Sequence, residues 1–339
     1  MSKLTKIIFN LDLDDCLIGN IVSQNTKFIL LQAVDQDGNL GGLEYIKKSE
    51  NIVIQKQAPE VDFYGNFEIK DLFNLRQLNE KFIDFRFTSF KELFQNISSS
   101  NLITIKTKNS SELTGYVLKV DDSKVFFELN TQDYPLVIPI EDILGISIND
   151  INNLLEAKYH DNEVSTSDLV ALYLDYEDDS RFGEALVGTV IFHNDDYLVL
   201  ENLNDIGQLD SYVLINRDFI IHTEQYTEML GYYEFLKNWQ IQNGSFDPNH
   251  LSEQLPELGE SINIEEFLKN QNGEIITVND YQLDNVNTGK VVGIEDKKIF
   301  LKNIDNFKLD SNIQEFNYSD LASVDLISND LLKLEQFFK

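Results

Sequence analysis

The sequence feature that most constrains the fold is a pattern that occurs four times along the chain. Each copy has a glycine, a Val or Ile two positions later, a polar turn and then an apolar run, and the glycines are Gly19, Gly115, Gly188 and Gly289. A β-rich segment precedes each glycine, and another closes each copy after a loop. Short strands at this spacing, separated by turn residues, predict about five strands per copy and are typical of small β-barrels.

The order of these segments resembles the Sm-like and SH3-like small barrels. A glycine in such a barrel lets a strongly bent strand pass close to its neighbour, so the resemblance implies a structural role for the four glycines. Residues 89–97, 150–159 and 263–273 have helical patterns before three of the copies, and an Sm-like barrel also carries a helix before its first strand. The Ile-Arg-Gly-like strand of the Sm family is absent, and Ile143-Leu144-Gly145 only approaches it.

The copies also match in pairs, the first with the third and the second with the fourth. Their glycines lie 169 and 174 positions apart, which indicates a duplicated two-barrel module. We therefore predict a mainly β protein with helices (α+β), built as four tandem Sm-like small barrels in two similar modules. The expected parts are barrel 1 (1–60), a helical connector (61–87), barrel 2 with a preceding helix (88–150), barrel 3 with a preceding helix (151–223), a second helical connector (224–261), and barrel 4 with preceding and C-terminal helices (262–339).

Residues 7–20, IIFNLDLDDCLIGN, raise the question of a phosphatase. Asp12-Leu13-Asp14 after an apolar run resembles the first motif of the haloacid-dehalogenase phosphatases, in which the first Asp attacks phosphorus. A helix follows this motif in that family, whereas here an alternating, β-rich segment follows. The matching stretch of the third copy also grows to DYEDDSRFGEA, as a hairpin loop tolerates. We interpret Asp12, Asp14 and Asp15 as the solvated end of a hairpin and expect no catalytic residue.

Acidic residues far outnumber basic ones, with 58 Asp and Glu against 27 Lys and Arg and a net charge of −31. Residues 1–170 hold 16 basic and 26 acidic residues, whereas residues 171–339 hold 11 and 32. Such a surface repels phosphate backbones and anionic lipids, which argues against nucleic-acid and membrane partners. It favours a cationic protein partner, mimicry of a polyanion, or solubility alone.

Composition and motifs argue against several other chemistries. The single cysteine, Cys16, cannot form an internal disulfide, and the first residues hold acids where a signal peptide needs a small-residue cleavage site. These features predict a cytoplasmic protein, and the Asn-, Ile- and Lys-rich composition suggests a bacterium or phage. The four histidines lack metal-ligand spacing. Asp35, Asp37 and Glu44 match only part of a calcium-binding loop, so we expect no metal and no cofactor.

The second connector is rich in aromatic residues, which serve either as core or as anchors of a protein interface. It includes Tyr232 and the only tryptophan, Trp239. The candidate partner-binding residues combine these two aromatics with the acidic clusters nearby, and they are Asp175, Glu177, Asp178, Asp179, Asp195, Asp196, Tyr232 and Trp239.

These observations predict a non-catalytic acidic protein that neutralises or regulates a cationic protein, as immunity, antitoxin and anti-defence proteins do. Three alternatives remain open at this point. They are a protein that binds or sequesters a small, nucleotide-like ligand, an Sm-like RNA binder, and an Asp-dependent phosphatase.

Overall fold

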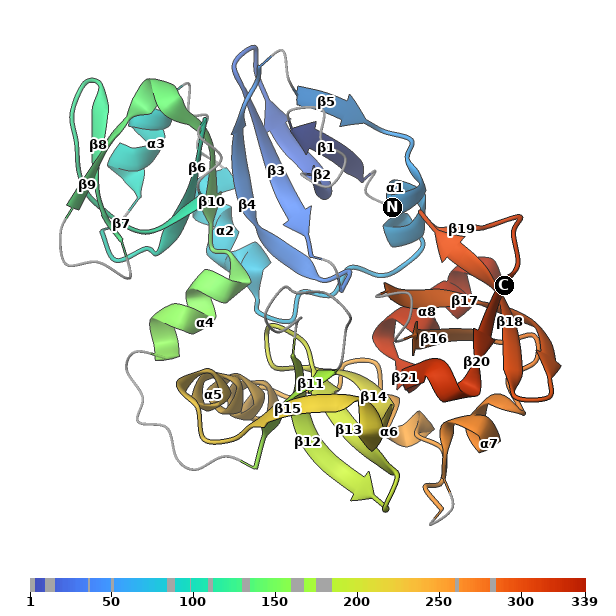
Figure 1. Cartoon of the computed structure of the whole chain (residues 1–339). Coiled ribbons are helices and arrows are strands. Elements are labelled where there is room, and N and C mark those ends of the chain that lie inside the picture. The colour runs from blue at the N-terminus through green and yellow to red at the C-terminus, as the bar shows by residue number, and fades with distance from the viewer. Residues whose placement is uncertain are drawn as a thin grey trace. The chain divides into compact units, whose positions relative to one another are not determined.

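The strands of the chain form two antiparallel sheets, and each sheet belongs to its own compact unit (Figure 1). The units comprise residues 1–161 and 162–339. The computed structural model describes residues 4–9, 16–35, 37–49, 52–83, 89–97, 99–108, 112–129, 135–159, 168–174, 185–259, 262–280 and 285–339.

The first unit contains a ten-stranded sheet in the order β5-β1-β2-β3-β4-β10-β6-β7-β8-β9. Its first repeat supplies β1 (Thr5–Phe9), β2 (Cys16–Gln24), β3 (Phe28–Val34), β4 (Leu40–Lys47) and β5 (Ile52–Gln55). Its second repeat supplies β6 (Ile103–Thr107), β7 (Glu112–Val120), β8 (Lys124–Leu129), β9 (Pro135–Pro139) and β10 (Ile143–Ile148). In both repeats the fifth strand pairs with the first, so the two repeats share one internal strand order.

The second unit has an eleven-stranded sheet with the same order, β15-β11-β12-β13-β14-β21-β16-β17-β18-β19, and β20 also pairs with β18. Its third repeat supplies β11 (Val170–Leu174), β12 (Leu186–His193), β13 (Tyr197–Leu203), β14 (Leu209–Asn216) and β15 (Ile220–Glu224). Its fourth repeat supplies β16 (Ile275–Asp280), β17 (Asn285–Glu295), β18 (Lys298–Asp305), β19 (Lys308–Leu309), β20 (Gln314–Asn317) and β21 (Leu321–Ser328). The repeated order agrees with a duplicated two-repeat module.

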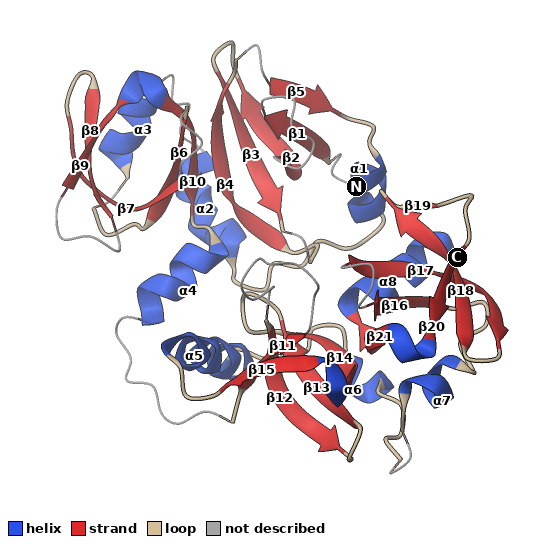
Figure 2. Ribbon diagram, viewed as in Figure 1, coloured by secondary structure: helices blue, strands red, loops and turns tan. Residues whose placement is uncertain are grey.

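Short helices lie between and beside the strands (Figure 2). The first unit has α1 (Pro59–Gly65), α2 (Leu75–Ile83), α3 (Phe90–Asn96), α4 (Ile151–Tyr159) and the 3₁₀ turn η1 (Ile140–Asp142). The second has α5 (Glu228–Gln242), α6 (Leu251–Gln254), α7 (Ile264–Leu268), α8 (Asn329–Phe338), η2 (Arg217–Phe219) and η3 (Tyr318–Asp320). Within the described residues, no helix is long and apolar enough to cross a bilayer.

The expectation of separately closed barrels is wrong, because the sheets are not closed. In the first unit the fourth strand, β4, pairs with β10, the fifth strand of the next repeat, and Tyr45 lies opposite Ile146. In the second unit β14 pairs with β21 in the same way, and Leu214 lies opposite Val324. Each unit is therefore one continuous sheet. Alternation of apolar and polar residues predicts strands, but it does not show which neighbouring strand each one pairs with.

The four glycines that recur in the repeats lie where the second strand of each repeat bends sharply against the third. A Cβ on Gly19, Gly115 or Gly188 would lie 2.0–2.2 Å from a carbonyl oxygen of the neighbouring strand, and one on Gly289 would lie 2.7 Å from it. A β-bulge follows at the same position in all four repeats, between the second and fourth residues after each glycine. Glycine and bulge together let the strand curve, as the sequence pattern indicates.

Asx turns join the second and third strands of three repeats. The side-chain Oδ1 atoms of Asn25, Asp121 and Asn194 each accept hydrogen bonds from two backbone N–H groups that follow in the turn. The fourth repeat uses a tight turn after Glu295 instead, with Lys297 at φ +61°. The polar residues that mark these turns in the sequence therefore fix the hairpins locally.

The helical patterns of the sequence form helices with side-chain caps. Ser89 Oγ accepts from Glu92 N at the start of α3, and Asn263 Oδ1 accepts from Glu266 N at the start of α7. The helix expected before the third repeat, α4, lies in the first unit instead. Its Asn153 Nδ2 donates to Thr104 Oγ1 of β6 at 2.9 Å, so the division of the chain falls after this helix rather than before it.

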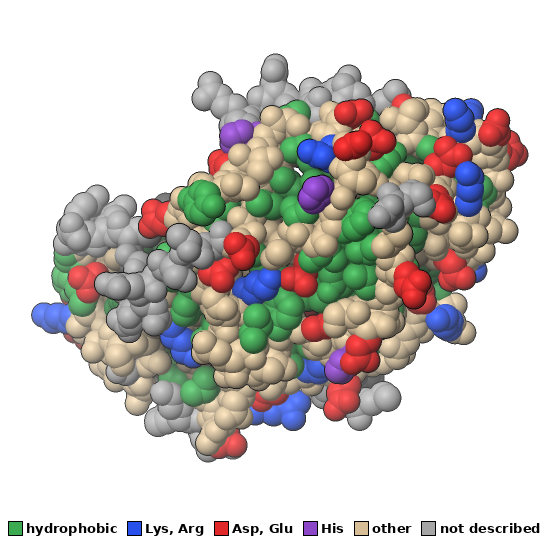
Figure 3. All heavy atoms as spheres, turned by 90° about the horizontal axis from the view of Figure 1, so that it is seen from below, with side chains coloured by type: hydrophobic (Ala, Val, Ile, Leu, Met, Phe, Trp, Pro, Cys, Tyr) green, Lys and Arg blue, Asp and Glu red, His purple; other side chains and the backbone are tan. Residues whose placement is uncertain are grey.

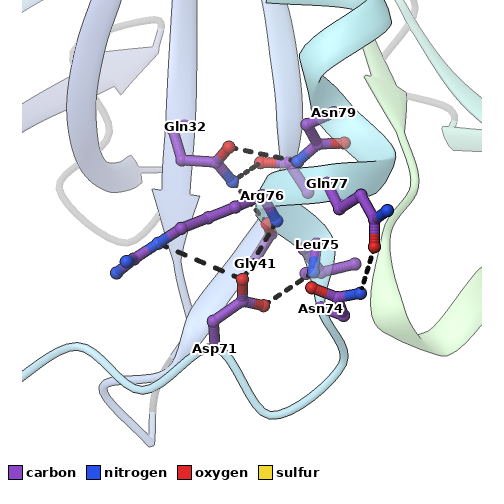
Figure 4. A network of polar contacts seen from close by, with 9 residues as sticks. Gln32, Gly41, Asp71, Asn74, Leu75, Arg76, Gln77 and Asn79 are labelled. Carbon is purple, nitrogen blue, oxygen red and sulfur yellow. Dashed lines mark hydrogen bonds and ion pairs between the residues drawn. The ribbon is translucent and has the colours of Figure 1, made fainter.

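Polar contacts tie the first connector to the junction of its two repeats (Figure 4). Asn79 of α2 donates to Gln32 Oε1 of β3 at 3.1 Å, and Gln32 Nε2 donates to the Gly41 carbonyl at 2.6 Å. Asn149, just after β10, donates to Asn79 Oδ1 at 2.8 Å. Asp71 accepts from Leu75 N at the start of α2. Because these buried amide groups form hydrogen bonds with one another, they fix the position of α2 on the sheet.

The second connector uses an ion pair at the equivalent strand position. Lys237 Nζ of α5 lies 2.8 Å from Glu201 Oε1 and donates to Thr189 Oγ1 at 2.9 Å. Glu201 stands 13 residues after Gly188, as Gln32 stands 13 residues after Gly19. Both side chains of the pair are only 17% exposed, so each connector helix is anchored on the third strand of its unit by a buried polar contact.

The glycine geometry makes a testable prediction for the second unit. Replacing Gly188 with Ala would place a Cβ 2.0 Å from the Glu201 carbonyl oxygen, and we expect a loss of about 3 kcal/mol in the free energy of unfolding. Urea unfolding followed by fluorescence of Trp239, the only tryptophan, measures it. The control is Gly259→Ala, where a Cβ meets nothing within 4 Å. An equal effect of both changes would contradict the bent-strand explanation.

Candidate functional site

The structure describes only part of the expected acidic interface. Asp175, Glu177, Asp178 and Asp179 lie outside the described residues. Asp195 and Asp196 are exposed in the turn between β12 and β13, and Arg217 Nη1 donates to the Asn194 carbonyl of that turn at 2.8 Å. The turn therefore combines two exposed carboxylates with one exposed guanidinium, and it is less uniformly acidic than the sequence run indicates.

The two expected aromatic anchors lie on α5, and both are half-buried. The ring of Tyr232 stacks on Phe235 with centroids 6.4 Å apart. The helix packs through Leu230 and Leu236, which are fully buried. The most exposed aromatic residue of this connector is instead Tyr226, at 76%. Tyr226, which precedes α5, therefore offers more exposed aromatic surface than Tyr232 or Trp239.

On the face that Figure 3 draws, the described acidic side chains lie at several separate places. Figure 3 shows them across the whole face it draws, interspersed with Lys and Arg. Several of the basic residues pair with carboxylates, as Lys298 does with Glu315 and Lys269 with Glu265. The excess of acidic residues therefore contributes to the electrostatic field around the whole protein.

A second candidate site lies inside the first unit, where its two repeats join. Glu44 of β4 and Ser147 of β10 are cross-strand partners at this junction. Ser147 Oγ donates to Glu44 Oε1 at 2.6 Å. A carboxyl group thus lies in the middle of a sheet whose neighbouring positions are apolar, with Leu43 and Ile146 almost fully buried.

The environment of Glu44 favours its neutral form. Burial raises the pKa of the Glu44 carboxyl to about 8, and the nearby carboxyl groups of Asp150 and Glu112 act in the same direction. The Ser147 hydrogen bond and the charge of Lys106 oppose the rise. Burial also raises the pKa of Asp150, although backbone N–H groups at the start of α4 donate to it and oppose the shift. Desolvation is the dominant cause for both groups.

These residues line a cavity of about 420 Å³. Phe9, Leu17, Ile46 and Ile146 form apolar wall, and Thr104, Thr114, Ser147 and Asn153 add hydroxyl and amide groups. The charged lining residues are Glu44, Glu112, Asp150 and Lys106. A cavity of this size with a few convergent polar groups has the usual character of a small-ligand site.

The second unit also has one carboxyl group at the equivalent cross-strand pair, but there it is on the fifth strand instead of the fourth. Val213 of β14 lies opposite Asp325 of β21, where the first unit has Glu44 opposite Ser147. Burial raises the pKa of Asp325 to about 8, the nearby Asp210 adds to the rise, and a hydrogen bond from Ser328 opposes it. Both junctions therefore contain one acid that is mostly protonated at neutral pH.

The other sequence motifs do not assemble into sites among the described residues. Asp35 accepts from Asn39 N at 2.7 Å in the β3–β4 turn, whereas Glu44 bonds to Ser147 on the other side of β4. No group of three or more His, Cys, Asp or Glu in the described residues could hold a metal ion. Asp12, Asp14 and Asp15 lie outside the described residues, but β1 pairs antiparallel with β2, with Ile8 opposite Cys16. This hairpin differs from the parallel strand and helix of the phosphatase motif.

No protein-family model matches the chain, and no curated protein matches it.

Sequence reasoning considered Glu44 only as the last position of a calcium-like loop and did not consider Asp325. One signal was visible, because each acid interrupts an otherwise apolar strand, in GGLEYIK and in LASVDLIS. The sequence did not reveal which strand pairs with each of these two strands. It is this pairing between repeats that places the acids at the junction.

The raised pKa of Asp325 predicts how the stability of the second unit depends on pH. The native state keeps a proton that the unfolded chain, with a pKa near 3.8, releases. Raising the pH from about 5 to about 8 therefore favours unfolding, by at most about 1.4 kcal/mol per pH unit. Asp325→Asn mimics the neutral acid, so its stability should depend less on pH.

Urea unfolding followed by Trp239 fluorescence at several pH values measures this effect. The control is Asp195→Asn, which changes an exposed acid of the same unit and should keep the wild-type pH dependence. Identical pH profiles for wild type and Asp325→Asn would show that Asp325 is not protonated in the folded protein.

Proposed function

We propose that this is a non-catalytic acidic binding protein that neutralises or regulates a cationic protein in the cytoplasm, in the manner of immunity, antitoxin or anti-defence proteins. The observation that carries the proposal is the net charge of −31. Exposed carboxylates and surface ion pairs each contribute little to stability, typically under about 1 kcal/mol, so stability alone is a weak reason for such an excess. A large negative field instead accelerates association with a positively charged protein.

The second half of the chain is the proposed interface. It holds 32 acidic and 11 basic residues from position 171 onwards, and it includes the exposed Asp195 and Asp196. Tyr226, at 76% exposed, supports the aromatic part of the interface better than the half-buried Tyr232 and Trp239. An exposed aromatic ring gains most from burial by a partner.

The proposal includes the finer fold assignment, in which the four repeats are opened variants of an Sm-like small barrel. The shared strand order, the bent glycine strand and the bulge at one fixed position in all four repeats support it. An RNA-binding role is the weaker alternative, because the acidic surface repels phosphates. Binding of a small ligand is the second candidate, and the junction cavity of about 420 Å³ favours it.

The electrostatic part of the proposal is tested by association kinetics. A pull-down from the native host identifies the partner, and stopped-flow measurements then give the association rate at increasing salt. We expect Asp178, Asp179, Asp195 and Asp196 changed together to Asn to slow association several-fold at low salt and to weaken the salt dependence, because the steering charge is reduced.

The matched control removes four acidic charges from the first unit, by changing Glu80, Glu92, Glu128 and Glu141 to Gln, all of which are exposed. It should slow association less. Coincident curves for wild type and the Asp variant, or capture of RNA in place of a protein, would refute the proposal.

The phosphatase alternative has its own test. Changing Asp12 and Asp14 to Asn should leave partner association unchanged, because a hairpin end needs polarity and not a nucleophile. Hydrolysis of p-nitrophenyl phosphate by the wild type, measured by absorbance, should stay at background. Turnover that disappears in the double variant would establish the enzyme instead.

A further inference from the structure

Among the described residues that line the junction cavity of the first unit, acidic groups outnumber basic ones. Three carboxyl groups line it, from Glu44, Glu112 and Asp150, and Lys106 is the one basic residue among the described lining residues. Lys106 Nζ lies 3.8 Å from Glu112 Oε1 and 4.6 Å from the centroid of the Phe9 ring. The lysine can balance one carboxylate, so an excess of acid remains.

Keeping acids in such a place has an energetic cost. A buried carboxylate loses its hydration and repels its like-charged neighbours, which together favour the neutral acid. The raised pKa values of Glu44 and Asp150 show both effects. A bound cation would remove this cost, because it would allow the carboxyl groups to ionise and to form charge-assisted hydrogen bonds.

The walls indicate which kind of cation fits. Phe9, Leu17 and Ile46 supply apolar surface beside the acids, and Thr104, Ser147 and Asn153 supply neutral hydrogen-bonding groups. In the described residues, no cluster has the composition of a metal site. Apolar walls together with carboxyls match an alkyl chain that ends in a charged nitrogen head group.

We propose that this cavity binds a small organic cation, with a guanidinium or primary ammonium group among the carboxyls and an alkyl chain along the apolar wall. Glu44 is the central acceptor, because Ser147 orients its carboxyl group from the neighbouring strand.

The second unit supplies an internal comparison. Where the first unit pairs Lys106 with Glu112 across β6 and β7, the second pairs Asn279 with Val286 across β16 and β17. Its junction therefore keeps a carboxyl at the cross-strand pair, Asp325, with Asp210 nearby, but lacks the Lys106–Glu112 pair. The same strand order exists without that pair, so the fold does not require it.

The site lies within the first unit and does not depend on the proposed protein interface. Isothermal titration of the full chain with butylguanidinium tests it, with neutral butylurea as the isosteric control probe. We expect saturable binding of the cation and none of the urea up to about 10 mM. Glu44→Gln, which can still accept the Ser147 hydrogen bond, should weaken binding about tenfold or more.

Two further variants separate this proposal from general effects on the fold. Asp325→Asn removes the equivalent acid of the second unit and should leave the affinity unchanged. Glu112→Gln should weaken it, because Glu112 lines the same cavity. Equal binding of butylurea, no binding of the cation, or unchanged affinity in Glu44→Gln would each overturn the proposal.

The pH dependence of binding provides an independent readout. Asp150, Glu112, Lys106 and Cys16 line the cavity together with Glu44, and Glu44 must lose its proton when the cation binds. The affinity should therefore rise from about pH 6 to about pH 8 and then level off, with proton release visible as a buffer-dependent enthalpy. Glu44→Gln should lose most of this rise, and a wild-type affinity independent of pH would contradict the proposal.

The source of the cation is distinguished by a third probe, acetyl-Gly-Arg-Gly-amide. Binding of butylguanidinium without binding of the peptide identifies a free small molecule as the ligand. Equal binding of both, lost together in Glu44→Gln, identifies an arginine side chain of a protein. Either result supports a cation site at Glu44.

Discussion

Backbone pairing between the fourth strand of one repeat and the fifth strand of the next holds each half of this protein together. It joins β4 to β10 in the first unit and β14 to β21 in the second. An isolated five-stranded repeat would leave both of these edges unpaired, and exposed edges attract unwanted partners. The pairing removes them and buries Leu43, Ile146 and Val324 at the joint. One large hydrophobic core in each unit, and the cavity of the first unit, are built from both of the paired repeats.

The same contact creates the most unusual chemistry of the molecule. Two strands that are apolar along most of their length place one acid in the middle of each joint, Glu44 in one unit and Asp325 in the other. Glu44 is on the fourth strand of its repeat, whereas Asp325 is on the fifth strand of its repeat. Each keeps its proton at neutral pH because burial penalises its charge. Protonation and the stability of the joint are therefore linked.

The charge of the protein acts at two scales. Over the whole surface, the excess of carboxylates produces a long-range field that suits a cationic protein and repels nucleic acid. Inside the first unit, a small set of acids around Lys106 and Phe9 favours the local binding of a positive charge. The first effect governs the rate of encounter and falls with salt, whereas the second acts at short range and is coupled to the protonation of Glu44.

The sequence by itself determined the repeat, the bent glycine strands, the turns at Asn25, Asp121 and Asn194, and the capped helices α3 and α7. These features depend on neighbours in the chain, so local residue patterns encode them. Only the tertiary structure decided that repeats share a continuous sheet, that α4 belongs to the first unit, and that Glu44 meets Ser147, which lies 103 residues away. Backbone hydrogen bonds along a strand edge are nearly independent of side-chain identity, so the sequence did not reveal which edges would pair.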